Sequence, residues 1–190
     1  MKYILASASD RRKELLSRII ENFKIIVSDF DEDSVEFEGN VDEYVQKLSL
    51  GKANSVKNSF PEEQGVIISS DTIVVIDECI LGKPKDEKDA FNMIKMLSGR
   101  EHKVYSAVTV MNTLNGFVET KSLATKVYFS NLSDTEITKY ISKGESLDKA
   151  GGYGIQGFGG VLIEKIDGCY YNVMGLPLNM LNKMLEKAIQ

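Results

Sequence analysis

The chain has 190 residues, of which 43% are hydrophobic and 27% are charged, and its formal net charge is −5. We expect a single domain over residues 1–190, since this length is sufficient to bury a substantial core. The acidic balance argues against a nucleic-acid-binding protein, which needs a basic face to displace counterions from the phosphate backbone. It does not exclude a small phosphorylated ligand held by a few local cations.

Histidine and cysteine usage narrows the chemistry further. His102 is the only histidine, which excludes a three-histidine zinc site and an HExxH metalloprotease. Cys79 and Cys169 lie far apart without a CxxC motif, so neither a zinc site nor a disulfide framework is indicated. No signal peptide or membrane span is evident, so we expect a cytoplasmic protein whose chemistry rests on carboxylates, lysine, arginine and a hard divalent cation.

The first predicted elements surround a serine-rich turn. We expect a strand over 3–6, a helix capped by Ser7 or Ser9 that runs to about residue 20, and a strand over 23–27. Arg11 and Arg12 lie in the first turn of that helix, where the unpaired N–H groups already carry positive charge. One interpretation is a phosphate cradle with the anion between these groups, and the other is two solvent-exposed arginines.

An acidic, irregular stretch over 28–43 precedes a helix over about 41–58. The acidic run that includes Glu32 either supplies a metal ligand or is a solvated loop. In the helix, Lys52 falls on the otherwise apolar face, so its ammonium either reaches to water or points at a bound anion. Gly51 beside it would allow something to approach the helix closely.

The next strand, over 65–76, contains the polar sequence SSDT. Asp71 is costly in a buried strand unless it is paired, bound to a metal or placed at a bend. It is either a candidate general base or Mg²⁺ ligand, or part of a bulge in which Asp and Ser bond local N–H groups. After a turn and a short strand over 79–81, Lys83 lies in a Gly-Lys-Pro turn, where a plain surface lysine is the alternative.

The second half alternates helices and hairpins. We expect a helix over 86–97, long strands over 104–111 and 117–129 joined at Asn115-Gly116, a capped helix over 133–142, a hairpin of 161–166 with 169–173, and a last helix after Pro177. The segment GGYGIQGFGG is either a flexible loop or a place where backbone approaches a ligand, with Gln156 able to read a base edge. The pattern predicts an α/β fold with a mixed, partly antiparallel sheet flanked by helices.

Six ordered blocks carry a resemblance over essentially the whole chain. They are LASASDRRKELL at 5–16, SSDTIV at 69–74, GKP at 82–84, LSGREHKVYSAV at 97–108, DKAGGYGIQGFGG at 148–160 and VMGLP at 173–177. Together they resemble the Maf-like nucleotide pyrophosphatases. One departure is Asp10, which stands where the motif commonly has proline.

The resemblance implies an α/β fold with a central cleft, a cytoplasmic homodimer, and hydrolysis of nucleoside triphosphates to monophosphate and diphosphate with Mg²⁺ or Mn²⁺. It gives Asp71 the role of proton acceptor and places Glu32, Lys52, Lys83 and the segment with Ser7, Ser9 and Arg12 in that cleft, with Glu32 and Asp71 as candidate metal ligands. Arg11, Thr72 and Gln156 match the branch that acts on dTTP and UTP, whereas the 7-methyl-GTP branch has other residues there.

Two other functional classes stay open at this point. A non-catalytic nucleotide-binding regulator, linked to cell division, would keep the arginines and lysines but would not need Asp71. A 7-methyl-GTP pyrophosphatase would keep the reaction and change the substrate. We expect a nucleoside triphosphate ligand in each case, and no nucleic-acid or membrane partner.

Overall fold

The structure is a computed structural model that describes residues 1–190. Its strands are β1 (Tyr3–Leu5), β2 (Lys24–Ile25), β3 (Val66–Ile76), β4 (Cys79–Leu81), β5 (Glu101–Asn112), β6 (Phe117–Phe129) and β7 (Ile163–Asp167). Its α-helices are α1 (Asp10–Ser17), α2 (Val41–Ser59), α3 (Glu87–Leu97), α4 (Asp134–Ile141), α5 (Tyr170–Met174) and α6 (Leu178–Ala188). Three 3-10 helices are η1 (Glu32–Ser34), η2 (Ala150–Gly152) and η3 (Gly157–Leu162). None of the helices has both the length and the apolar character needed to cross a membrane.

The seven strands form one sheet in the order β2-β1-β3-β5-β6-β7, with β4 paired to β3 off this path. β1 is parallel to both β2 and β3, whereas β3–β4 and β6–β7 are antiparallel. The chain divides into two compact units. Unit 1 comprises residues 1–71, 106–123 and 175–190, and unit 2 comprises 72–105 and 124–174.

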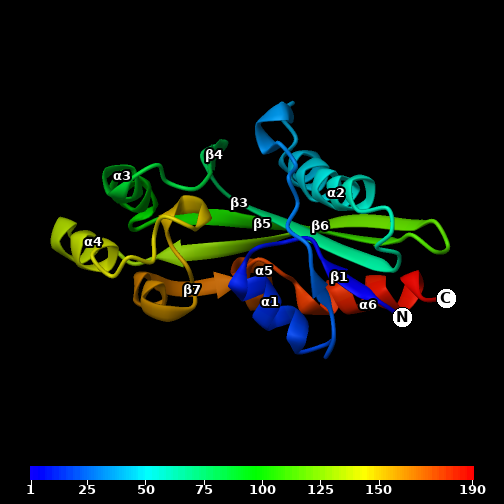
Figure 1. The fold of residues 1–190 in the computed structure, drawn as a ribbon. Coiled ribbons are helices and arrows are strands. Elements are labelled where there is room, and N and C mark those ends of the chain that lie inside the picture. Colours follow the sequence, from blue (N-terminus) through cyan, green and yellow to red (C-terminus); the bar gives the residue numbers. More distant parts are fainter. The chain divides into compact units, whose positions relative to one another are not determined.

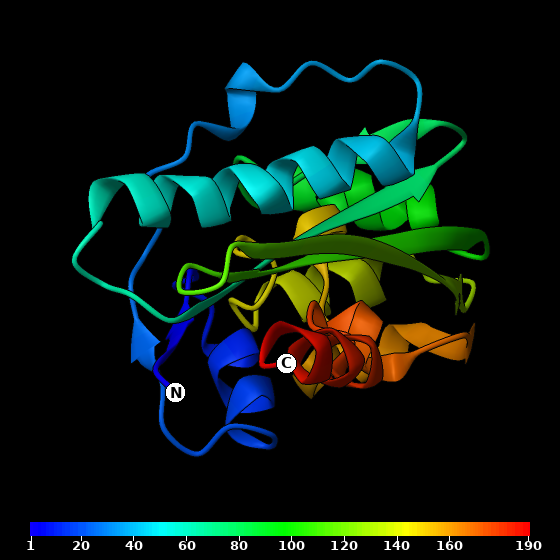
Figure 2. The same cartoon turned by 90° about the vertical axis from the view of Figure 1, so that its right-hand side faces the viewer.

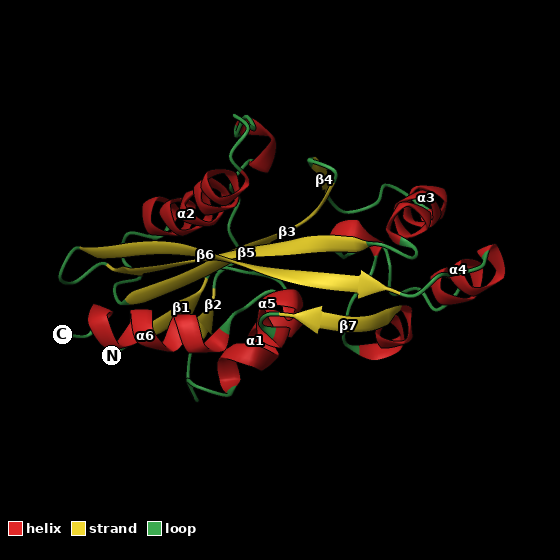
Figure 3. Ribbon diagram, turned by 180° about the vertical axis from the view of Figure 1, so that it is seen from behind, coloured by secondary structure: helices red, strands yellow, loops and turns green.

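In unit 1, helices cover both faces of the sheet. α2 lies on one face, and α1 and α6 lie on the other (Figures 1 and 2). Figure 3 shows α1 and α6 again on the same side of the strands. The α2 side of this core includes Ala53 and Val56 packed with Ile67 and Met111. Helix α2 begins where the Asn40 side chain accepts hydrogen bonds from the first backbone N–H groups, as expected for an N-cap.

In unit 2, α3 and α4 pack together beside the strands (Figure 1). Their buried faces share a core with the strands, in which Ile94 of α3, Ile137 of α4 and Phe129 of β6 are almost fully buried. Ser133 and Glu136 form a complete capping box at the start of α4, which confirms the prediction for that helix.

The predicted mixed α/β sheet with flanking helices is confirmed, whereas the single domain and the central cleft stay predictions. The predicted strand over 169–173 is wrong, because Tyr170–Met174 forms the helix α5. The helical turn brings the amide of buried Asn172 to the Val104 carbonyl at 2.9 Å and the Thr125 hydroxyl at 3.0 Å. A buried amide needs such partners, and this need outweighs the weak alternation of the segment.

Smaller differences concern element ends. Helix α1 ends at Ser17 instead of about residue 20, and β2 contains only Lys24–Ile25. Strand β3 runs through the SSDT sequence from Val66 to Ile76 with all but one of its residues buried. The polar sequence therefore belongs to a regular buried strand, and Asp71 is not explained by a break in it.

Candidate functional site

The parallel pairing of β1 with β3 places two of the predicted site segments next to each other. Leu5 pairs with Ile68, and the Ala6 N–H donates to the Ile68 carbonyl at 2.8 Å. The turn with Ser7 follows β1 directly, and Asp71 lies three residues beyond the last β1 pair on β3. The carboxyl end of β1 and the start of α1 therefore lie beside the middle of β3, a position where open α/β sheets commonly bind ligands.

Serines and Arg12 organise the turn between β1 and α1. Ser9 is the N-cap of α1 and accepts from the Arg12 backbone N–H at 3.4 Å, while the Ser9 N–H donates to the Ser7 hydroxyl at 3.2 Å. The Arg12 guanidinium donates through Nε to the Gly175 carbonyl at 3.0 Å and through one terminal nitrogen to the Ser7 hydroxyl at 3.5 Å. Arg12 is thus held inward, and the alternative of two solvent-exposed arginines is wrong for Arg12.

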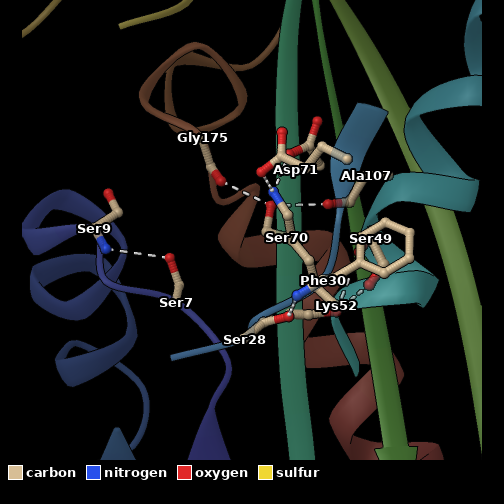
Figure 4. A network of polar contacts seen from close by, with 12 residues as sticks. Ser7, Ser9, Ser28, Phe30, Ser49, Lys52, Ser70, Asp71, Ala107 and Gly175 are labelled. Atoms are coloured by element: carbon tan, nitrogen blue, oxygen red, sulfur yellow. Dashed lines mark hydrogen bonds and ion pairs between the residues drawn. The ribbon is translucent and has the colours of Figure 1, made fainter. Parts of the chain in front are cut away.

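A buried carboxylate and an ammonium form the centre of the site (Figure 4). Asp71 on β3 is 5% exposed, and its carboxylate pairs with the Lys52 ammonium of α2. The same ammonium lies 2.9 Å from Glu32 Oε1 in η1, and the Lys52 side chain is only 13% exposed. Lys52 therefore does not reach out to bulk water, and two carboxylates converge on one ammonium.

Helix and strand periodicity explain why this pair forms. Ser49 and Lys52 are three residues apart on α2, and Ser69 and Asp71 are two apart on β3, so each pair projects from one face of its element. The hydroxyls of Ser49 and Ser69 lie 3.3 Å apart, one step along the same α2–β3 contact. Ser49 also contacts the Thr109 hydroxyl at 3.0 Å. These buried hydroxyl contacts fix where α2 sits on the sheet, and with it the position of Lys52.

The charges in this part of unit 1 influence one another. Burial lowers the pKa of Arg12; the carboxylates of Asp71 and Glu32 oppose this shift and the charge of Arg11 adds to it. Burial, followed by the negative charges of Asp71 and Glu32, raises the pKa of Tyr44 on α2. Arginine, lysine and both carboxylates therefore belong to one electrostatic environment.

The remaining predicted site residues lie in unit 2. Thr72 follows Asp71 in β3 and is half-buried, Lys83 is exposed in the loop after β4, and Gln156 is half-buried in the glycine-rich segment. Within this unit the Gly151 N–H donates to the Gly82 carbonyl at 3.0 Å, so the Gly-Lys-Pro turn is joined to that segment. The structure thus brings together seven of the predicted residues in unit 1: Ser7, Ser9, Arg11, Arg12, Glu32, Lys52 and Asp71. The functional roles of these residues, and of Thr72, Lys83 and Gln156, stay predictions.

Several residues that hold the site were not singled out from the sequence. The Ser70 hydroxyl donates to the Ala107 carbonyl at 2.8 Å and to the Gly175 carbonyl at 2.9 Å. The Gly175 carbonyl therefore accepts hydrogen bonds from both Ser70 and Arg12. These bonds connect the VMGLP segment to the site. The position of Ser70 next to a buried acid could have drawn attention to it in the sequence. Its partner Gly175 lies 105 residues away, and no local pattern predicts that hydrogen bond.

The donor set is suited to a hard cation only in part. No group of three or more histidine, cysteine, aspartate or glutamate side chains is arranged to hold a metal ion. Asp71 and Glu32 nevertheless provide two carboxylates at one place, since both contact Lys52. Mg²⁺ is commonly bound by one or two carboxylates with substrate phosphates and water completing its shell, so these residues fit that mode.

Comparison with known proteins gives concordant matches over the full chain. Residues 2–188 match the family described as Maf-like protein. A dTTP/UTP pyrophosphatase of Clostridium botulinum (strain Eklund 17B / Type B) is 62% identical over 100% of both chains. One of Clostridium beijerinckii (strain ATCC 51743 / NCIMB 8052) is 59% identical over 98% of this chain and 99% of its own.

Proposed function

The chain belongs to the Maf-like protein family, and we propose that it hydrolyses nucleoside triphosphates, above all dTTP and UTP, to the nucleoside monophosphate and diphosphate. The observation that carries the proposal is the buried Asp71 carboxylate paired with Lys52 in unit 1. Full-length relatives at 59–62% identity that are named dTTP/UTP pyrophosphatase support the substrate class.

Asp71 is the proposed general base. Its carboxylate accepts a proton from a water molecule while the water oxygen attacks the α-phosphorus, and the bond to the leaving diphosphate breaks. The proton then passes from Asp71 to solvent. A base needs a fixed position, and the pairing with Lys52 holds the Asp71 carboxylate in place.

The phosphates are proposed to lie over the N-terminus of α1. The N–H groups there and the Ser7 and Ser9 hydroxyls offer hydrogen bonds, and Arg12 offers a planar guanidinium next to them. Lys52 lies beside the base and would neutralise a phosphate oxygen close to the reacting centre. Positioning and charge neutralisation account for most of the rate gain in phosphoryl chemistry.

Asp71 and Glu32 are the residues proposed to hold a divalent cation, Mg²⁺ or Mn²⁺. When bound, the cation would neutralise phosphate charge and help to orient the substrate. The Lys52 ammonium contacts both carboxylates and offsets one of their two negative charges. Removal of divalent cations by chelation is expected to abolish turnover and to leave the fold intact.

Base recognition is proposed for Arg11, Thr72 and Gln156, and phosphate binding for Lys83. The homodimer and the cytoplasmic location that the resemblance implies belong to the same proposal. Gln156→Ala is expected to raise KM for dTTP and UTP and to reduce the preference over CTP. Light scattering of the purified protein tests the dimer.

The test is to incubate the purified protein with Mg²⁺ and, separately, dTTP, UTP, CTP and 7-methyl-GTP, and to follow diphosphate release. Release from dTTP and UTP is the expected result. Release from 7-methyl-GTP alone would keep the enzyme class and reject the roles of Arg11, Thr72 and Gln156. Nucleotide binding without any release would reject the enzyme in favour of a nucleotide-binding regulator.

A further inference from the structure

Gly51 lies in the interior of α2, where glycine is unfavourable because it adds no side-chain contact and loses much backbone freedom. The aromatic ring of Phe30 lies directly against it. A Cβ atom at position 51 would come within 3.0 Å of three ring carbons of Phe30, closer than side chains pack. Glycine is therefore what lets this ring rest on the helix, one residue before Lys52.

The loop that carries Phe30 is anchored to the same face of α2. The Phe30 backbone N–H donates to the Ser28 hydroxyl at 3.1 Å, and that hydroxyl donates to Ser55 at 3.0 Å. Ser55 in turn bonds the Asp29 carboxylate. Gly51 and Ser55 are four residues apart on the helix, so the loop makes two contacts along one stripe of α2.

The loop continues into η1, which places Glu32 beside Lys52. The Asp31 side chain accepts from the Asp33 N–H at 3.2 Å, and the Ser34 hydroxyl donates to the Asp31 carbonyl at 2.6 Å, which together close η1. The Glu32 side chain is 52% exposed yet lies 2.9 Å from Lys52. Since little packing surrounds Glu32 itself, the conformation of the loop sets its place.

We infer that the contact between Phe30 and Gly51 positions Glu32 on Lys52 and is required for efficient turnover. This inference rests on the proposed function, in which Glu32 and Lys52 belong to the reaction centre. Phe30 and Gly51 are positioning residues, because they act through Glu32 and do not touch the reacting atoms. A glycine at this place in the helix thus has a functional reason.

The test uses Gly51→Ala and Phe30→Ala, each alone and combined with Glu32→Gln. Asn58→Ala is the matched control, because it adds the same residue to an exposed part of α2 away from the loop. Diphosphate release from dTTP gives kcat and KM. Labelling of Lys52 by an amine-reactive reagent, followed by mass spectrometry, reports the Glu32–Lys52 contact without turnover.

We expect Gly51→Ala and Phe30→Ala to lower kcat about tenfold or more, as misplacement of a catalytic group by about an ångström does. In the Glu32→Gln background the same substitutions should change kcat less than about twofold, because the group that they position is already lost. Lys52 labelling should rise several-fold in both variants, to the level of Glu32→Gln. Asn58→Ala should change neither quantity.

Equal losses of kcat in the wild-type and Glu32→Gln backgrounds would overturn the inference, as would unchanged Lys52 labelling in both variants. If Gly51→Ala does not fold, Phe30→Ala carries the test, because it removes the ring without a clash. Absence of diphosphate release from the wild type would reject the proposed function, while the labelling cycle would still decide whether the contact places Glu32 on Lys52.

Discussion

The polar interiors of unit 1 and unit 2 differ in charge. Unit 1 holds the Lys52–Asp71 ion pair, with Arg12 partly buried nearby. Unit 2 holds neutral partners, above all the contact between His102 Nε2 and the Tyr153 hydroxyl at 2.6 Å. His102 is 2% exposed, and burial, opposed by Glu101, lowers its pKa to about 4, so it is neutral near pH 7.

This difference separates a packed core from a reaction centre. In unit 2 the hydrogen bond between His102 Nε2 and Tyr153 offsets the loss of hydration of two neutral groups, although His102 Nδ1 is buried without a hydrogen-bond partner. Charges in the interior lose more hydration free energy than neutral groups do, and pairing restores it only in part. Apolar residues would make a more stable core at the position of Lys52 and Asp71. The cost of keeping charges there is explained by the proposed chemistry, in which Asp71 accepts a proton and Lys52 neutralises a phosphate oxygen.

The largest expected effect is the loss of the proposed base. Asp71→Asn removes the proton acceptor but keeps the shape of the side chain, so kcat for dTTP should fall by about 10²–10⁴. Thermal unfolding and dTTP binding by calorimetry check that the variant folds and binds. A variant that turns over at the wild-type rate would exclude Asp71 from this role.

Acid should destabilise unit 2 through His102. The pKa of His102 in the folded chain is about 4, below its ordinary value of 6.5. Between these two pH values the histidine is protonated in the unfolded chain and neutral in the folded chain. Stability is therefore full above pH 6.5 and falls toward pH 4, by about 3 kcal/mol in all. Urea unfolding at several pH values measures this slope.

His102→Gln is the control for that slope, because the amide can still bond Tyr153 but does not titrate. Depressed carboxyl pKa values, such as those of Glu63 and Glu101, reduce stability as the pH falls below the ordinary glutamate value of 4.5. The window from pH 6.5 to about 5.5 lies above the titration of these carboxylates and thus isolates the histidine. A slope in this window that persists in His102→Gln would contradict the assignment.

In the ion pair of unit 1, the loss of one charged partner should destabilise the fold more than the loss of both. Lys52→Met leaves the Asp71 carboxylate without its cation, and we expect the free energy of unfolding to fall by about 3 kcal/mol. The double variant Lys52→Met with Asp71→Asn should regain most of this loss, since the only carboxylate then left without its cation is that of Glu32, which is 52% exposed to water. Urea unfolding of the three variants gives the comparison, and failure of the double variant to recover would contradict it.

The smallest expected effect concerns the start of α1. Asp10 lies in the first turn of α1, and its negative charge offsets the positive charge near the proposed phosphate position. Asp10→Pro should therefore lower KM for dTTP by about two- to threefold without changing kcat. Steady-state kinetics measure this shift, and a raised KM would count against the proposed position of the phosphates.

Sequence patterns predicted the features that depend on residues close together in the chain, such as helix capping and helix periodicity. The capping box of Ser133 and Glu136 marked α4, and periodicity placed Lys52 on the inner face of α2. Lys52 pairs with Asp71 because of the way α2 packs on β3. Residue spacing in the sequence does not predict that packing. The bonds from Ser70 and Arg12 to Gly175 likewise join segments more than a hundred residues apart.

The error at 169–173 has the same origin. Five residues with weak alternation fit a strand or a helical turn equally well, and the long-range partners of Asn172 decide between them. Similarly, the sequence indicates only that Gly51 would allow some group to approach the helix closely. The group that approaches is the Phe30 ring, which belongs to the irregular stretch before α2. Its contact with Gly51 is seen only in the three-dimensional structure.

Hydrolysis of dTTP in H₂¹⁸O by the wild type and Asp71→Asn, followed by mass spectrometry of the products, tests the central claim most directly. We predict that ¹⁸O enters dTMP, that diphosphate is released unlabelled, and that the rate falls at least about a hundredfold in Asp71→Asn. Label in diphosphate, release of orthophosphate with dTDP, or equal rates in the two proteins would contradict attack at the α-phosphorus assisted by Asp71.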